Sequence, residues 1–127
     1  MKKQVMLALG AFVLGSTLYA QSGTAATAVC SGTAGPGTSL PTASDGTTFV
    51  RQAMTVKCSN NVNMQADQDT AKAWVASASS KGKFFWGGNS DGGGVSKLGG
   101  DTNVVTPGST PDVAGQLDKA KVAGTST

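Results

Sequence analysis

The feature that most constrains this chain is its pair of cysteines, Cys30 and Cys58. The segment after the first of them, Ser31 to Gly46, is rich in Gly, Pro, Ser and Thr, which form turns and add little to a core. We expect this segment to be a loop. The alternatives, a metal site or a reactive thiol pair, lack a His ligand and a Cys-x-x-Cys spacing. In an oxidising compartment the two cysteines are therefore expected to form a disulfide.

The N-terminus has the three parts of a secretory signal peptide. Lys2 and Lys3 give a positive start, Val5 to Leu14 is apolar, and small residues lead up to Ala20. We predict cleavage after Ala20, with Ala26-Thr27-Ala28 as a second small-x-small sequence. The apolar run is shorter than the roughly 20 residues that span a bilayer. We therefore expect an exported protein, periplasmic, at the cell surface or extracellular, with no membrane span after signal removal.

Removal of residues 1–20 changes the charge of the chain. The whole sequence carries ten Lys and Arg against seven Asp. Two lysines leave with the signal, so the mature chain has eight cations and a net charge of +1. These cations are scattered along the sequence, whereas a nucleic-acid-binding domain has a cationic patch or stripe. We therefore expect no nucleic-acid partner.

The mature chain has the length of one domain. Residues 21–28 are predicted to be a flexible lead-in, 29–123 a single small β-rich domain, and 124–127 a polar tail. Large apolar residues make up about a fifth of the mature chain, and none of them is Ile. Because so small a core leaves a domain marginally stable, we expect the crosslink to decide whether the domain persists.

The segment Thr47–Cys58 alternates in the way of a half-buried β-strand. The turn sequence Ser59-Asn60-Asn61 follows, and alternation resumes over Val62–Ala66. We expect these two strands to pair as a hairpin. The two faces of the first strand are apolar and polar: Val50, Met54, Val56 and Cys58 against Arg51, Thr55 and Lys57.

Residues 67–86 predict a second hairpin. Asp67 or Asp69 is suited to cap a short helix, but the alternation that follows favours a strand from about Thr70. Ser80–Lys83 is then a turn, and Phe84–Trp86 returns as a strand. This hairpin is expected to bring Trp74 and Trp86 within reach of each other.

The segment Gly87–Gly94 is predicted to contain no regular element, since each Gly costs backbone entropy and adds no packing. It also contributes oxygen atoms that calcium uses as ligands. The spacing of these residues matches neither an EF-hand nor the glycine-aspartate repeat of a calcium-binding β-roll. A turn-forming loop is the favoured interpretation, and we expect no metal or cofactor. The calcium alternative would use Asn89, Asp91, Asp101 and Asn103.

The C-terminal part predicts brief strands within Val95–Gly100 and at Val104-Val105. A short helix is expected to follow. Thr110 and Pro111 are typical of a helix start. The predicted helix runs over residues 112–122 with Val113 and Leu117 on one face, and Gly115 weakens it.

The candidate ligand-binding residues are Lys81, Lys83, Phe85 and Trp86. Three successive aromatic residues on a strand point alternately to its two faces. At least one ring is then exposed, unless a second layer covers both faces as in a small sandwich. An exposed ring beside lysines is suited to stacking on a sugar or to a subunit contact.

The side chains that most enzymes use are missing. Without His or Glu, Ser-His-Asp and Cys-His arrangements are excluded, and a paired-carboxylate mechanism would need two of the seven Asp. Those Asp lie mostly beside Gly, Ser, Thr or Pro, where turns and caps use them. We expect no enzyme activity.

Together these patterns predict a mainly β protein with a small antiparallel sheet or sandwich, one disulfide and a short C-terminal helix. Low charge and edge-prone strands favour a non-enzymatic, exported structural or adhesive protein of the cell surface that self-associates. The alternative is a small extracellular binding module whose aromatic and lysine strand contacts a polysaccharide.

Overall fold

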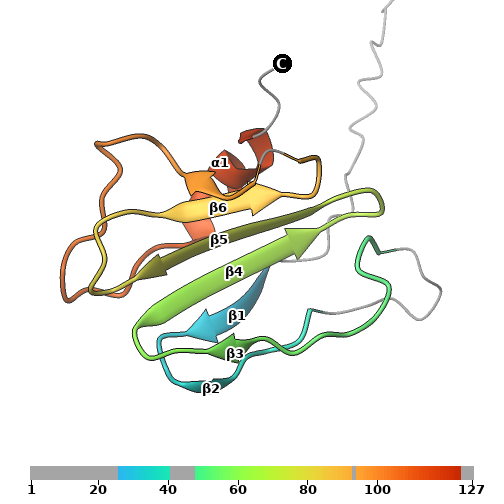
Figure 1. The fold of residues 1–127 in the computed structure, drawn as a ribbon, viewed down its shortest axis with the longest axis horizontal. Coiled ribbons are helices and arrows are strands. Elements are labelled where there is room, and N and C mark those ends of the chain that lie inside the picture. Colours follow the sequence, from blue (N-terminus) through green and yellow to red (C-terminus); the bar gives the residue numbers. More distant parts are fainter. Residues whose placement is uncertain (1–25, 41–47, 93, 124–127) are drawn as a thin grey trace, which may run out of the picture.

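The computed structural model describes residues 26–40, 48–92 and 94–123. They form a five-stranded antiparallel sheet in the order β1-β4-β5-β6-β7, a two-stranded ribbon β2-β3, and a short C-terminal helix (Figure 1). The predicted fold class is therefore confirmed. The elements are β1 Thr27–Ser31, β2 Gly35–Pro36, β3 Lys57–Cys58, β4 Val62–Gln68, β5 Ala73–Ser79, β6 Trp86–Asn89, β7 Ser96–Lys97, the 3-10 turn η1 Ala114–Gln116 and α1 Leu117–Val122.

The predicted signal peptide (residues 1–20), residues 21–25 of the predicted lead-in and the tail 124–127 lie outside the described residues, as does the segment 41–47. The last part of the predicted lead-in lies in the sheet, since β1 begins at Thr27. Among the described residues, no helix has the length and apolar character needed to cross a bilayer.

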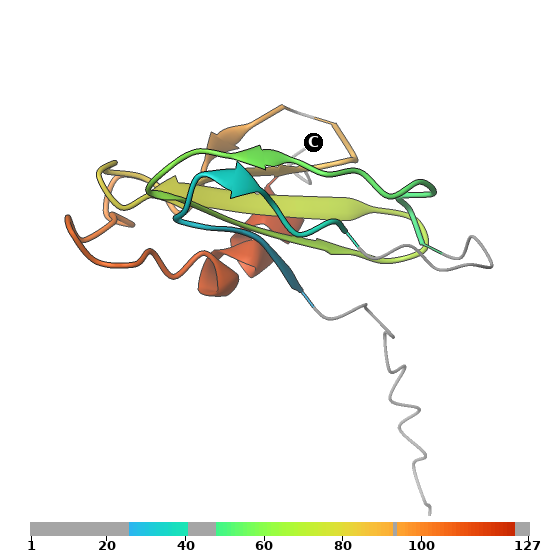
Figure 2. The same ribbon diagram turned by 90° about the horizontal axis from the view of Figure 1, so that it is seen from below.

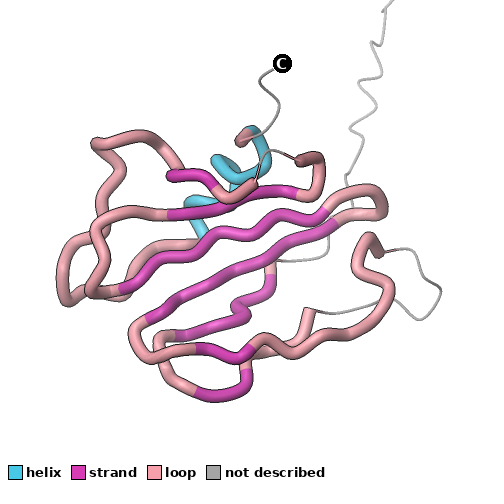
Figure 3. The backbone as a smooth tube through the Cα atoms, viewed as in Figure 1, coloured by secondary structure: helices cyan, strands magenta, loops and turns pink. Residues whose placement is uncertain are grey.

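Different parts of the chain cover the two faces of the sheet. Helix α1 packs against β5 and β6 on one face. The β2-β3 ribbon lies on the other side of the sheet, as the turned view in Figure 2 shows. We call the side of the sheet opposite α1 the open face, because the ribbon and the irregular chain drawn in Figure 3 cover only part of it.

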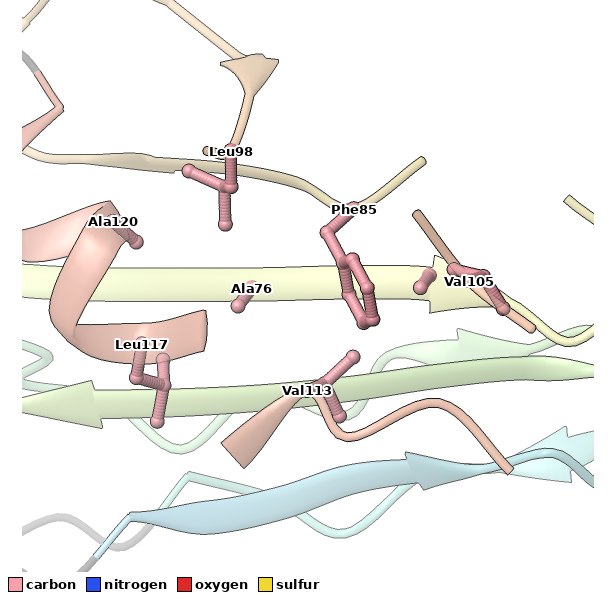
Figure 4. Packing of buried hydrophobic residues seen from close by; sticks show 8 residues of the cluster. Ala76, Phe85, Leu98, Val105, Val113, Leu117 and Ala120 are labelled. Atoms are coloured by element: carbon pink, nitrogen blue, oxygen red, sulfur yellow. The ribbon is translucent and has the colours of Figure 1, made fainter. Parts of the chain in front are cut away.

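The face under α1 holds the larger core. Strand β5 contributes only small buried side chains to this core, those of Ala76 and Ala78. They alternate along the strand with residues that point to the other face. Figure 4 shows the larger side chains gathered between the sheet and the C-terminal segment. The buried members are Ala76, Ala78, Phe85, Leu98, Val105, Val113, Leu117 and Ala120.

Gly87 lets the helix lie close to the sheet. A Cβ at this position would lie 2.5 Å from the carbonyl oxygen of Val75, 2.7 Å from Leu98 Cδ1 and 3.3 Å from the Cβ of Ala120. The prediction that residues 87–94 contain no regular element was wrong at its start, since β6 runs from Trp86 to Asn89. Close packing requires a glycine in this strand, and that requirement outweighs its entropic cost.

Two polar contacts fasten α1 to the sheet. Asn89 Nδ2 donates hydrogen bonds to the carbonyl oxygens of Ala120, at 3.0 Å, and of Ala123. These carbonyls belong to the helix end, where intrahelical donors run out. Lys121 Nζ lies 3.0 Å from Oδ2 of Asp67, a buried carboxylate on β4. The same ammonium lies 5.3 Å from the ring centroid of Trp74.

The predicted C-terminal helix is confirmed over residues 114–122. Val113 and Leu117 are both buried, as expected of its inner face. The cap differs from the prediction, because Asp112 Oδ1 accepts a hydrogen bond from the Gly115 N–H at 3.1 Å. A Cβ on Gly115 would lie 2.6 Å from Asp112 Oδ2, so the glycine makes room for this carboxylate. Asp112, and not Thr110, stabilises the start.

The predicted disulfide is present. Cys30 on β1 and Cys58 on β3 are bonded with their Cα atoms 5.7 Å apart. Both cysteines belong to a second buried cluster with Val29 and Ala66. The bond ties the ribbon to the sheet, because the ribbon itself has only the pairs Gly35↔Cys58 and Pro36↔Lys57.

The predicted strand Thr47–Cys58 is wrong over most of its length. Thr47 is not among the described residues, residues 48–56 are irregular, and only Lys57–Cys58 form a strand. Met54, expected on the inner face, is 53% exposed. The Gly37 N–H still donates to the Val56 carbonyl oxygen at 2.7 Å, but the next N–H of the facing chain, that of Thr38, donates to the Val29 carbonyl oxygen at 2.9 Å. The facing chain thus turns from the ribbon to β1, and the ladder ends.

The predicted hairpin between this segment and Val62–Ala66 is also wrong. Strand β4 is confirmed, but it pairs with β1 and β5, whereas β3 pairs with β2. Both edges of β4 are thus occupied. The disulfide holds β3 against β1 instead.

The ambiguous segment 67–73 joins two strands. Asp69 Oδ1 accepts hydrogen bonds from the backbone N–H groups of Ala71 and Lys72, each at 2.7 Å. This carboxylate therefore stabilises the β4–β5 turn rather than a helix, and β5 follows as the favoured strand. The expected contact between Trp74 and Trp86 is wrong. Trp74 is in register with Asn89, three residues beyond Trp86, so the two rings point to opposite faces.

We expect replacement of both cysteines, Cys30→Ala with Cys58→Ala, to lower the free energy of unfolding by about 3 to 4 kcal/mol, because the unfolded chain regains loop entropy. Urea titration of the oxidised protein and of the variant measures the difference. Equal midpoints with equal slopes would contradict a structural role for the bond.

The hydrogen bond from Lys121 to Asp67 raises the pKa of Lys121 above 10.5. A raised folded-state pKa means that the pair stabilises the fold below the unfolded pKa of 10.5 and loses this contribution as the pH rises through the folded value. We expect the difference in unfolding free energy between the wild type and Lys121→Gln to be constant near neutral pH and to shrink as the pH rises above 10.5. Urea titrations across this range measure it, and a difference independent of pH would refute the assignment.

Candidate functional site

The turn that precedes the aromatic residues is confirmed. The Gly82 N–H donates to the carbonyl oxygen of Ser79 at 2.9 Å, and the Lys81 N–H donates to Ser79 Oγ at 3.2 Å. Lys81 and Lys83 are exposed on this turn. The turn reverses the chain so that β6 returns beside β5.

Phe85, one of the four predicted ligand-binding residues, lies in the core. Its side chain is 5% exposed, and Figure 4 shows its ring among the buried residues beneath the C-terminal segment. The ring therefore packs in the interior and does not face the solvent with its neighbours. Strand alternation places the adjacent ring, Trp86, on the opposite face.

Trp86 is 46% exposed on the open face. In register it lies opposite Ser77 of β5 on one side and Lys97 of β7 on the other. The Ser77 hydroxyl donates to the Trp86 carbonyl oxygen at 3.5 Å. An indole ring is thus flanked across the sheet by a hydroxyl group and an ammonium group.

Phe84 completes this part of the open face. It forms an isolated bridge with Val104, which is 45% exposed. The ammonium groups of Lys83 and Lys97 lie 5.2 Å and 4.6 Å from the centroid of the Phe84 ring. Such distances are typical of cation–π contacts. We call Lys83, Phe84, Trp86 and Lys97 the lysine–aromatic cluster.

Phe84 and Lys97 were not predicted from the sequence as members of this cluster. Lys97 is brought there by β7, a strand of only two residues in the predicted segment 95–100. Its ammonium also pairs with Asp101, and this hydrogen bond lowers the pKa of the Asp101 carboxyl below 3.8. The alternation of Phe84 and Trp86 was the available signal for Phe84, whereas no local spacing in the sequence indicates Lys97.

Two apolar grooves lie beside one another on the open face. The first has a volume of about 280 Å³ and the second about 100 Å³. Val75 lines both, so they meet at β5. None of the described residues that line either groove is charged. The first is lined by Val75, Ser77, Gly87, Gly88, Asn89, Gly94 and Val95, and the second by Val29, Thr38, Leu40, Met54, Val56, Met64, Ala66 and Val75.

Exposed apolar side chains border both grooves. Met54 at the second groove is 53% exposed, and Val95 at the first is 76% exposed. Both residues come from irregular segments that lie over the sheet. In a chain with so few large apolar residues, this leaves a substantial part of them in contact with solvent.

The oxygen-bearing residues weighed as calcium ligands have separate partners. Asp91 pairs with Lys72 at 2.5 Å, and Asp101 pairs with Lys97. Asn103 Nδ2 donates to the Leu98 carbonyl oxygen at 2.8 Å and to Gln116 Oε1 at 2.7 Å, while Asn89 holds the helix end. Among the described residues, no group of three or more His, Cys, Asp or Glu side chains could hold a metal ion.

Comparison of the chain with models of protein families, with curated protein sequences and with solved structures gives no match. Its function must therefore be inferred from its own residues.

Because Phe85 is buried and Trp86 is exposed, truncation of the two rings is expected to lower stability by unequal amounts. We expect Phe85→Ala to lower the free energy of unfolding by about 3 to 5 kcal/mol, because it leaves a cavity in the core. Trp86→Ala is expected to cost less than about 1 kcal/mol, because nearly half of the residue's surface is already exposed to solvent. Urea titration with the disulfide intact compares them, and a larger loss for Trp86→Ala would reverse the assignment of faces.

Proposed function

We propose that this chain is a non-enzymatic, exported structural or adhesive protein of the cell surface that associates with further copies of itself. The disulfide and the absence of a spanning helix among the described residues are compatible with export. The proposal is supported chiefly by one observation, the pair of uncharged apolar grooves on the open face.

The grooves have the character of a contact surface. Contiguous apolar surface on a small exported protein is costly to leave in water, at about 25 cal/mol per Å². Val95, Val75 and Met54 form a row across the two grooves, from the first to the second. Burial of such a row against another protein is the usual way to remove it from solvent.

A second copy of the chain is a suitable partner for this surface. The lining residues of both grooves carry no charge, so two copies meeting there would not bring like charges together. The mature net charge of +1 also gives little long-range repulsion between molecules. Association is therefore limited by shape and by apolar area, which favours assembly at the high local concentrations of a cell surface.

A non-enzymatic role agrees with the contacts of the carboxylates. Asp69 and Asp112 accept hydrogen bonds from backbone N–H groups, as structural turn residues do. Asp67, Asp91 and Asp101 are engaged with lysines. The chain has no His and no Glu to serve as an alternative general base.

Sedimentation velocity of the mature, oxidised protein over a range of concentrations tests the proposal. We expect reversible oligomers, and we expect Val95→Lys to raise the dissociation constant at least about tenfold, since a charge would enter the contact. Val122→Lys is the matched control, because Val122 is also exposed, at 66%, but lies on α1.

The control is expected to associate like the wild type. A wild-type protein that is monomeric at all concentrations, or equal weakening by both substitutions, would overturn the proposed role of the open face.

A further inference from the structure

We propose that the lysine–aromatic cluster binds an acidic polysaccharide, one whose sugars carry carboxylate groups. This inference does not depend on self-association, because none of the four residues of the cluster lines either groove. The sequence predicted a polysaccharide contact through Lys81, Lys83, Phe85 and Trp86. The structure changes that set, since Phe85 is buried and Phe84 and Lys97 take part instead.

Trp86 supplies the platform for a sugar ring. Its side chain is 46% exposed and projects from a regular strand, so its direction is fixed by the sheet. The C–H groups on one face of a pyranose are apolar and pack well on an indole ring. An indole side chain has only two rotatable bonds, and binding therefore costs little conformational entropy.

Two lysines supply the charge that selects an acidic sugar. Lys97 is in register with Trp86, and its ammonium lies 4.6 Å from the Phe84 ring centroid. Lys83 approaches the same ring to 5.2 Å, and among the described residues it forms no salt bridge. Asp101 compensates Lys97 only. The cluster thus keeps a net positive charge beside its aromatic platform, complementary to a carboxylate on a sugar ring.

The neighbouring groove gives a chain of sugars room to continue. The Ser77 hydroxyl, opposite Trp86, lines the first groove, and its oxygen keeps lone pairs that can accept from a sugar hydroxyl group. Gly88, two residues beyond Trp86 on the same face, is covered by the backbone of Gly94, since a Cβ there would lie 3.0 Å from the Gly94 carbonyl oxygen. The room for sugars is the groove of about 280 Å³ that Ser77 and Val95 line. The surface from Trp86 to Val95 therefore accommodates more than one ring, which favours a polymer over a single sugar.

The number of cations favours a glycan over a nucleic acid. Binding of nucleic acid depends on neutralising many phosphates at once. The mature chain has a net charge of only +1, and the cluster contains two lysines, with Lys81 on the adjacent turn. Stacking on Trp86 is open to a nucleic-acid base as well as to a sugar ring, so the preference rests on the small number of cations, and single-stranded DNA is the competitor in the test.

Titration calorimetry with polygalacturonate fragments and the mature, oxidised protein tests the inference, with dextran fragments of equal length as the neutral comparison. We expect polygalacturonate to bind, dextran to bind at least about tenfold more weakly, and the affinity to fall as salt is raised. Trp86→Ala and Lys97→Gln are each expected to lose about tenfold in affinity. Lys119→Gln, on α1, is the matched control and is expected to bind like the wild type.

Two further measurements separate glycan binding from self-association and from a loss of folding. Met54→Gln, which weakens the apolar contact at the second groove and leaves the surface from Trp86 to Val95 unchanged, is expected to bind polygalacturonate like the wild type. Circular dichroism and intact mass establish that each variant is folded and crosslinked. Equal binding of dextran, tighter binding of single-stranded DNA, or full affinity in folded Trp86→Ala would each overturn the proposal.

Discussion

The bond between Cys30 and Cys58 is the interaction on which the open face depends. The β2-β3 ribbon has two residue pairs, too few to persist alone. Because its Cys58 end is linked to β1, the irregular chain before β3 is kept near the sheet, and Met54 and Val56 line one of the grooves. A crosslink that replaces missing core packing thus also shapes the surface on which the proposed function rests.

The chain has few large apolar side chains, and they are distributed between the two faces of the sheet. Under α1, small residues such as Ala76 and Gly87 allow the C-terminal segment to approach closely, and a few larger ones, Phe85 and Leu98 among them, fill the space. The open face receives no comparable layer from the described part of the chain. Its apolar side chains, Met54 and Val95, are left partly in water. Because small residues form much of the packing under α1, apolar residues remain available for contacts on the open face.

The sequence predicted those features that local patterns determine. Alternation of apolar and polar residues predicted β4 and β5, and the presence of two cysteines predicted the disulfide. The spacing of Val113 and Leu117 predicted the buried face of the helix. It failed where distant chain segments decide the outcome. Gly87 lies in a strand because α1 packs closely against it, and the segment before Cys58 is irregular because the facing chain turns to β1 at Thr38. Of the site, Lys83 and Trp86 were predicted, whereas Lys97 reaches Phe84 only through tertiary folding.

The adjacency of Phe85 and Trp86 has a consequence for how this chain can change. Neighbouring residues on a strand point to opposite faces of the sheet. One residue inserted into the Ser80–Lys83 turn, if it shifted the register of β6, would therefore exchange the buried and exposed residues along that strand. The bulky indole would then enter the space made for a phenyl ring, and the glycine that admits the helix would move out of place. An insertion or deletion that this turn does not absorb is therefore expected to be far less tolerated during divergence than point substitutions at the same positions.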